Sequence, residues 1–174
     1  MVRSLARVAI SLGSNVENRE ASLRLGAAGL ARLHRASRCS RVYETQPMHV
    51  TDQPAFLNAC CTGWTDLTPV ELLAALKKLE RHAGRLPGGR RYGPRPLDLD
   101  LLLHGDQVID EPGLIVPHAR LRERAFVLVP LAELAADWVV PASRGAPSAT
   151  VRELAAAAGT RGVVATTLDL QCCS

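Results

Sequence analysis

The stretch RRYGPRPLDLDLLL, residues 90–103, constrains the fold more than any other part of the chain. Side chains on a β-strand alternate between its two faces. A strand over residues 97–104 therefore directs four leucines to one face and two aspartates to the other. The leucines are Leu97, Leu99, Leu101 and Leu103, and the aspartates are Asp98 and Asp100. Because the leucine face needs a hydrophobic core, this strand has to belong to a sheet that is covered on that side.

The two aspartates predict a cation site. Residues two apart on a strand are separated by roughly 7 Å at Cα. Two carboxylates this close repel each other unless a cation lies between them, and a divalent cation with oxygen ligands is the natural partner. Arg95, in the GPR tripeptide just before the strand, adds a fixed positive charge for an anion. Metal, arginine and anion together predict phosphoryl-type chemistry. The alternative is a pair of solvated side chains on a half-exposed strand.

Length and composition predict one globular domain over residues 1–174, large enough to build a core. Hydrophobic residues make up 47% and charged residues 22%, which excludes an intrinsically disordered chain. The net charge of +4 favours an acidic ligand, either a nucleotide or a nucleic acid. No apolar run reaches transmembrane length and no signal-peptide cleavage site is evident, so we expect a cytoplasmic protein without a membrane partner.

The cysteines predict neither a disulfide framework nor a zinc site. They are odd in number and none are in C-x-x-C spacing. They stand at positions 39, 60, 61, 172 and 173. Cys60 and Cys61 are expected to act as small apolar residues of a strand.

Periodicity and capping residues give the expected elements. The predicted strands are 6–12, 37–44, 55–64, 97–104 and 163–170; the predicted helices are 19–33, 69–83, 121–134 (interrupted at Pro130) and 151–158. Gly105-Asp106 is expected to turn the acidic strand back onto residues 107–109 in a hairpin. The order strand, helix, strand, strand, helix, strand predicts an α+β fold with a ferredoxin-like βαββαβ core, an antiparallel sheet, an added hairpin and C-terminal helices.

A second candidate site lies on the third predicted strand. Phe56 and Asn58 share a face there, so a ring can stack on a flat heterocycle while the amide binds its edge. The alternative is a core phenylalanine beside a polar strand residue.

These features together resemble one family, the 6-hydroxymethyl-7,8-dihydropterin pyrophosphokinases of folate biosynthesis. The resemblance runs from LGSN at 12–15 to about Leu134. Its motifs are TQPMHVTDQPAFLNAC at 45–60, ERHAGR at 80–85, RRYGPRPLDLDLLL at 90–103 and VPHARLRERAF at 116–126. It implies transfer of a diphosphoryl group from ATP to the hydroxymethyl group of the pterin, with release of AMP.

The resemblance also implies roles for individual residues. Asp98 and Asp100 resemble the pair that holds two Mg²⁺ ions, and Arg85 and Arg95 resemble catalytic arginines. The implied ATP contacts are Lys77, Glu80, Tyr92, Arg95, His118 and Arg124, and the implied pterin contacts are Thr45, Met48, Phe56, Asn58 and Phe126. The chain departs from the family pattern at Pro87, Tyr92 and Ala119, which bears on loop motion and ATP affinity.

ATP and the hydroxymethyl dihydropterin are thus the expected partners, with no nucleic acid, and the chain is expected to be a monomer. Three alternatives stay open at this point. An RNA-binding module would bind nucleic acid without magnesium. A two-metal nuclease or polymerase would act on nucleic acid and gives no reason for the Phe56–Asn58 pair. An ordinary kinase would release ADP.

Overall fold

The structure is a computed structural model and describes residues 4–16, 18–46, 54–84 and 95–170. Its elements are β1 (Ala6–Ser14), α1 (Arg19–Leu33), β2 (Arg35–Cys39), β3 (Arg41–Thr45), β4 (Phe56–Thr65), α2 (Pro69–His82), β5 (Asp98–His104), β6 (Ile109–Glu111), β7 (Leu114–Val116), the 3₁₀ turn η1 (Leu121–Glu123), α3 (Ala125–Ala135), β8 (Val139–Val140), β9 (Ala149–Thr150), α4 (Val151–Ala158) and β10 (Val163–Asp169). The predicted helices over 19–33, 69–83 and 151–158 are therefore confirmed to within one residue.

The main sheet is antiparallel, with strand order β10-β3-β4-β1-β5 and with β2 pairing alongside β4. Strands β2 and β3 follow one another along the same neighbour, so they act as a single bent strand. With β10 set aside, this is the order of a ferredoxin-like fold. The predicted fold class is confirmed.

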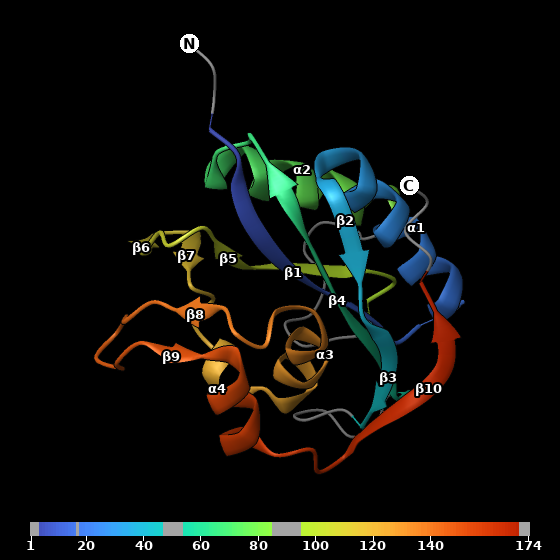
Figure 1. Cartoon of the computed structure of the whole chain (residues 1–174). Helices are drawn as coiled ribbons and strands as arrows, with labels where there is room; N and C mark the ends of the chain where they lie inside the picture. The colour runs from blue at the N-terminus through green and yellow to red at the C-terminus, as the bar shows by residue number, and fades with distance from the viewer. Residues whose placement is uncertain (1–3, 17, 47–53, 85–94, 171–174) are drawn as a thin grey trace.

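Helices cover both faces of this sheet and divide the core in two (Figure 1). On one face, Leu23 and Leu30 of α1 and Leu72 and Leu76 of α2 pack against β1, β4 and β5. On the other face, α3 and α4 pack over the opposite side of the same strands. The sheet therefore has one face under α1 and α2 and one face under α3, and the site described below lies on the α3 face.

Local sequence explains where the helices begin. The side chain of Thr68 accepts a hydrogen bond from the Glu71 N–H at 3.3 Å, while the Glu71 carboxylate accepts from the Thr68 N–H at 2.8 Å. This capping box, with Pro69 in the first turn, is the predicted start of α2. Gly84 follows the helix with φ +93°, a conformation that glycine adopts without strain.

Three predicted elements are wrong in detail. The strand expected over 37–44 is two strands. At Ser40 the backbone N–H donates to the Cys60 carbonyl at 2.9 Å, but the Cys60 N–H donates at 3.0 Å to the Ser40 hydroxyl and not to a backbone carbonyl. The hairpin from β5 back onto 107–109 is not formed; β6 pairs with β7 instead. The helix expected over 121–134 is a 3₁₀ turn followed by α3, and Pro130 lies inside α3 without ending it.

The cysteine prediction is also wrong. Cys39 and Cys61 form a disulfide, with their Cα atoms 4.2 Å apart. They lie directly opposite each other on β2 and β4, a pairing that sequence spacing does not reveal. Cys60 is a free, buried cysteine on the other face of β4, as expected for a small apolar strand residue, and burial raises the pKa of its thiol. Cys172 and Cys173 lie outside the described residues.

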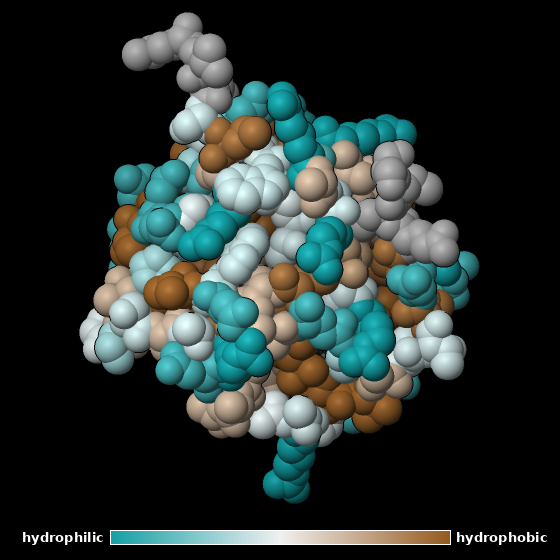
Figure 2. Space-filling model, viewed as in Figure 1, coloured by the Kyte–Doolittle hydropathy of each residue, from teal (hydrophilic) through white to brown (hydrophobic). Residues whose placement is uncertain are grey.

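The surface carries no continuous apolar face in the view of Figure 2, where brown residues form separate patches among teal ones. The exposed large hydrophobic residues are Leu5, Leu25, Trp64, Val70, Val108, Val139 and Val164. Among the described residues, no helix is long and apolar enough to cross a membrane.

His34 is a buried polar residue with an energetic consequence. Its side chain lies at the end of α1, against Gly63, and the residue is 5% exposed. Within the described part of the chain, neither ring nitrogen has a hydrogen-bond partner. Burial therefore lowers the pKa of His34 from 6.5 to about 4, because the charged imidazolium cannot be solvated there.

We predict that His34→Leu makes the protein less sensitive to acid. The unfolded chain binds a proton at His34 below pH 6.5 and the folded chain only below about pH 4, so His34 costs stability as the pH falls through this window. Urea unfolding at pH 7 and pH 4.5 should show that wild type loses about 2–3 kcal/mol more than the variant. His82→Leu, at an exposed histidine of α2, is the control. Equal losses in wild type and His34→Leu would contradict the prediction.

Candidate active site on the α3 face of the sheet

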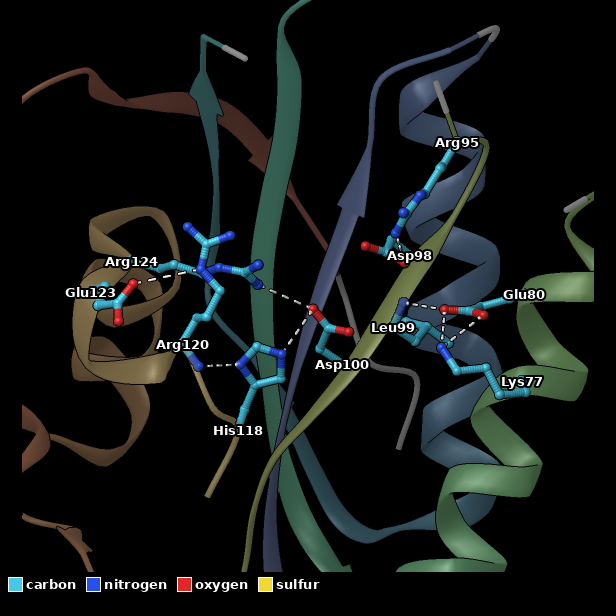
Figure 3. Close-up of polar contacts among 10 residues, drawn as sticks. All are labelled: Lys77, Glu80, Arg95, Asp98, Leu99, Asp100, His118, Arg120, Glu123 and Arg124. Carbon is cyan, nitrogen blue, oxygen red and sulfur yellow. Dashed lines mark hydrogen bonds and ion pairs between the residues drawn. The ribbon is translucent and has the colours of Figure 1, made fainter. Parts of the chain in front are cut away.

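The two aspartates of β5 point to the α3 face, as the alternation predicts. Leu99 and Leu101 are buried under α1 and α2, whereas the side chains of Asp98 and Asp100 keep 25% and 28% of their surface exposed. Figure 3 shows Asp100 facing His118 and Arg124, and Asp98 beside Arg95. The predicted acidic face of this strand is confirmed.

Leu103 is the exception to the predicted alternation. The pairing of β1 with β5 matches Ile10 with Leu101 but Ala9 with Leu103, so Leu102 is an extra residue in β5. Such a β-bulge turns the following side chain to the other face. Leu102 and Leu103 both pack in the core under α3, and the prediction that Leu103 shares a face with Leu99 is wrong.

Two arginines and a histidine from separate segments meet the two carboxylates. Arg95, just before β5, donates from Nη1 to Asp98 Oδ1 at 2.8 Å. Arg124, at the start of α3, donates from Nη1 to Asp100 Oδ2 at 3.4 Å, and His118 Nε2 lies 3.8 Å from the same oxygen. The structure thus brings together the predicted residues Arg95, His118 and Arg124 around Asp98 and Asp100 (Figure 3).

Backbone contacts hold His118 in this position. The backbone N–H of His118 donates to the carbonyl of the bulge residue Leu102 at 2.9 Å, which connects the segment after β7 to β5. Its Nδ1 accepts from the Arg120 N–H at 3.1 Å, so the neutral ring carries its proton on Nε2, facing Asp100. Burial lowers the pKa of His118, and the Asp100 carboxylate opposes this effect. The neutral imidazole is therefore a hydrogen-bond donor directed at the carboxylates.

A second predicted group lies beside the aspartates on β3 and β4. Asn58 is buried and donates from Nδ2 to Thr45 Oγ1 at 2.7 Å, and Phe56 lies directly opposite Thr45. Phe126 is in the first turn of α3, with the Arg124 guanidinium 5.5 Å from its ring centroid. A half-buried phenylalanine on the sheet and another on the covering helix thus border the same face, with a fixed amide beside them.

Lys77 and Glu80 lie on the opposite side of β5. Glu80 is 1% exposed, accepts from the Leu99 N–H at 2.9 Å and pairs with Lys77 Nζ at 2.9 Å. Figure 3 shows both side chains on α2, beyond the strand from His118 and Arg124. The carboxylate of Glu80 therefore hydrogen-bonds the strand backbone between the two aspartates.

Three predicted site residues, Arg85, Tyr92 and Met48, lie outside the described residues. One residue that sequence reasoning did not assign is Asn15. It is fully buried, its Oδ1 accepts from the Arg95 N–H at 2.9 Å, and its own N–H donates to the Arg95 carbonyl at 3.3 Å. The LGSN stretch contained it, but its partner is 80 positions away, so no local pattern indicates this role.

The chain is similar to known proteins over most of its length. The family model described as 7,8-dihydro-6-hydroxymethylpterin-pyrophosphokinase matches residues 9–136. A folate synthesis bifunctional protein of Arabidopsis thaliana is 52% identical over 132 residues, which cover 73% of this chain and 26% of that protein. The 2-amino-4-hydroxy-6-hydroxymethyldihydropteridine pyrophosphokinase of Pseudomonas aeruginosa is 41% identical over 145 residues, covering 82% of this chain and 89% of the relative.

Solved structures show the same fold. A crystal structure of Plasmodium falciparum HPPK-DHPS with pteroate superposes with a TM-score of 0.72 over 90% of this chain and 45% of that chain, at 13% sequence identity. This chain therefore spans about a quarter of its plant relative and under half of that structure.

We predict that Asn15→Ala loosens the segment that carries Arg95. The Arg95 N–H loses its buried acceptor, so its amide hydrogen should exchange faster, and the free energy of unfolding should fall by about 1–3 kcal/mol. Native-state hydrogen exchange followed by NMR measures both effects. Asn18→Ala is the comparison, because it removes an exposed helix cap and should leave Arg95 protected. An unchanged Arg95 exchange rate in Asn15→Ala would exclude this role for Asn15.

Proposed function

Because the chain belongs to the 7,8-dihydro-6-hydroxymethylpterin-pyrophosphokinase family, we propose that it transfers the β,γ-diphosphoryl group of ATP to the hydroxymethyl group of 6-hydroxymethyl-7,8-dihydropterin and releases AMP. The observation that carries this proposal is the pair Asp98 and Asp100, held on the same sheet face as the Phe56–Asn58 group. The pyrophosphokinases of Pseudomonas aeruginosa and Haemophilus influenzae, of which this chain covers 89% and 85%, support it by their names. The reaction is a step of folate synthesis.

The donors on β5 fit magnesium. Carboxylate oxygens are hard ligands, and those of Asp98 and Asp100 are partly exposed on one face. In the described ranges, no group of three or more His, Cys, Asp or Glu side chains is arranged to hold a metal by itself. Magnesium is commonly held by one or two carboxylates together with substrate phosphates, so we propose that the two aspartates hold two Mg²⁺ ions with ATP. When bound, these ions neutralise charge on the phosphate oxygens.

The surrounding cations would bind the triphosphate. Arg95 and Arg124 now pair with carboxylates. With the two carboxylates holding metal, the guanidinium groups of Arg95 and Arg124 would be available to phosphate oxygens, for which their planar donor arrangement is well suited. His118 adds an N–H donor from the same side. Arg85 and Tyr92 stay predictions of this site, as do nucleotide contacts of Lys77 and Glu80.

The aromatic and amide groups would orient the pterin. Phe56 and Phe126 would stack on the two faces of its ring, while Asn58 binds its polar edge and Thr45 fixes the Asn58 amide. Backbone groups near Met48 stay a further predicted contact. Orientation of this kind holds the hydroxymethyl oxygen in line with the β-phosphorus, and positioning supplies a large share of the rate in such transfers. Cytoplasmic location and a monomeric state also stay predictions.

Product analysis tests the proposed reaction. Incubation with ATP, Mg²⁺ and 6-hydroxymethyl-7,8-dihydropterin should yield AMP and the pterin diphosphate in equal amounts, measured by chromatography. Release of ADP would favour an ordinary kinase instead. Cleavage or extension of nucleic acid would favour the nuclease or polymerase alternative.

We expect Asp98→Ala and Asp100→Ala each to abolish measurable turnover while the fold persists. The carboxylates are partly exposed, so their loss leaves no buried cavity, but the proposed Mg²⁺ ions lose their ligands. Circular dichroism and steady-state AMP release measure the two properties separately. Asp106→Ala, at the 82% exposed aspartate of the turn after β5, should keep wild-type turnover. Unfolding of both site variants would indicate a structural role for these carboxylates.

We expect Arg95→Ala to raise the activation barrier by at least ~2 kcal/mol, about thirty-fold in kcat, because an electrostatic stabiliser of the phosphates is lost. Arg152→Ala, at an exposed arginine paired with Asp137, is the matched control. Wild-type kcat in Arg95→Ala would remove this residue from the mechanism.

A further inference from the structure

Gly13 lies in the middle of the proposed site, and its backbone conformation does not require a glycine. It belongs to β1, the strand between β4 and β5. It is not among the glycines with positive φ, so its conformation is open to any residue. A glycine inside a strand weakens that strand, and it often marks a position where a ligand approaches the backbone closely. The backbone of β1 is therefore uncovered by a side chain at Gly13, as it would have to be for a ligand to approach closely.

The register places Gly13 between the two halves of the site. On one side it pairs with Asn58 of β4, and on the other side it pairs with Asp98 of β5. Residues that pair across neighbouring strands share a face, so these three form one row on the α3 face. Two strand spacings separate the ends of the row, roughly 10 Å. Asn58 and Asp98 thus stand on either side of a position that has no side chain.

The sheet is open at this position. The neighbours of Gly13 in β1, Leu12 and Ser14, are buried on the opposite face, whereas Gly13 and Ser11 are partly exposed on the α3 face. Ala9, further along the same face, is fully buried under α3. A Cβ built on Gly13 would meet Asn58 Oδ1 at 3.3 Å and no other non-neighbouring heavy atom of the described structure within 4 Å. Among the described residues, therefore, only the Asn58 amide reaches the space above Gly13, which lies between that amide and the acidic side chain of Asp98.

We propose that Gly13 is the floor of the pterin site and determines how deeply the ring sits on the sheet. This inference rests on the proposed function. The fused ring, stacked between the two phenylalanines, stands with its rim over Gly13 of β1, its polar edge at Asn58 and its hydroxymethyl arm directed toward Asp98 and the phosphates. A side chain at this position would lift the ring and displace the Asn58 amide, which misplaces the attacking oxygen.

Substitutions of increasing size test the inference. In Gly13→Ala, binding of 6-hydroxymethyl-7,8-dihydropterin should weaken at least ~10-fold, the effect of one extra carbon in a closely fitting pocket. Gly13→Val should weaken it further. Calorimetric titration in the presence of Mg²⁺ and a non-hydrolysable ATP analogue measures pterin affinity without turnover. Affinity for the analogue and Mg²⁺ alone should stay within about two-fold of wild type.

A matched control comes from the same strand. Ser11→Ala, one row along on the α3 face, removes a hydroxyl without filling the floor and should keep pterin affinity close to that of wild type. Circular dichroism and urea unfolding show whether each variant folds; if Gly13→Val does not, Gly13→Ala decides. Unchanged pterin affinity in Gly13→Ala would overturn the inference, as would an equal loss of pterin and nucleotide binding. If wild type itself fails to bind the pterin or release AMP, the proposed function fails instead.

Discussion

The structure depends on the two-sided character of β5. Burial of Leu99 and Leu101 under α1 and α2 is strongly favourable, and it leaves only one orientation for the strand. A shift of one residue would expose these leucines and bury Asp98 and Asp100 without partners, which costs several kcal/mol per charge. The hydrophobic core therefore holds the two carboxylates side by side on the α3 face, although repulsion alone would separate them.

That repulsion is offset by groups from distant parts of the chain. Two of them are guanidinium groups, those of Arg95, which precedes β5, and Arg124, which begins α3. The third is the neutral imidazole of His118, which follows the small β6–β7 hairpin and adds a hydrogen-bond donor. Two of these residues are held through their own backbones: Asn15 hydrogen-bonds the backbone of Arg95, and the Leu102 carbonyl accepts from the backbone N–H of His118. Under the proposed function, the same two guanidinium groups that pair with the aspartates would bind phosphate, for which their planar donor arrangement is suited.

The second half of the site consists of a hydrogen-bonded amide and aromatic rings, in contrast to the charged groups of the first half. Asn58 is held by Thr45 across neighbouring strands, and aromatic rings stand on the sheet and on α3. Between this group and the acidic pair the sheet carries only Gly13 and Ser11, so the two halves share one open surface. Under the proposed function, groups on β4, β5 and α3 would position the substrates above these small residues.

The periodic features could be predicted from the amino-acid sequence. The capping box at Thr68 and Glu71, the alternation around Asp98 and Asp100, and the order of elements are local, because they depend on residues within a few positions of one another. The family resemblance rested on a few motifs, and these motifs indicated the site residues Arg95, His118, Asn58 and Phe126. Tertiary structure alone decided the pairing of Cys39 with Cys61, the bulge that turns Leu103 to the other core, and the contact of Asn15 with Arg95. These depend on strand register and on the approach of residues far apart in the chain, which packing of the whole core determines and no local pattern encodes.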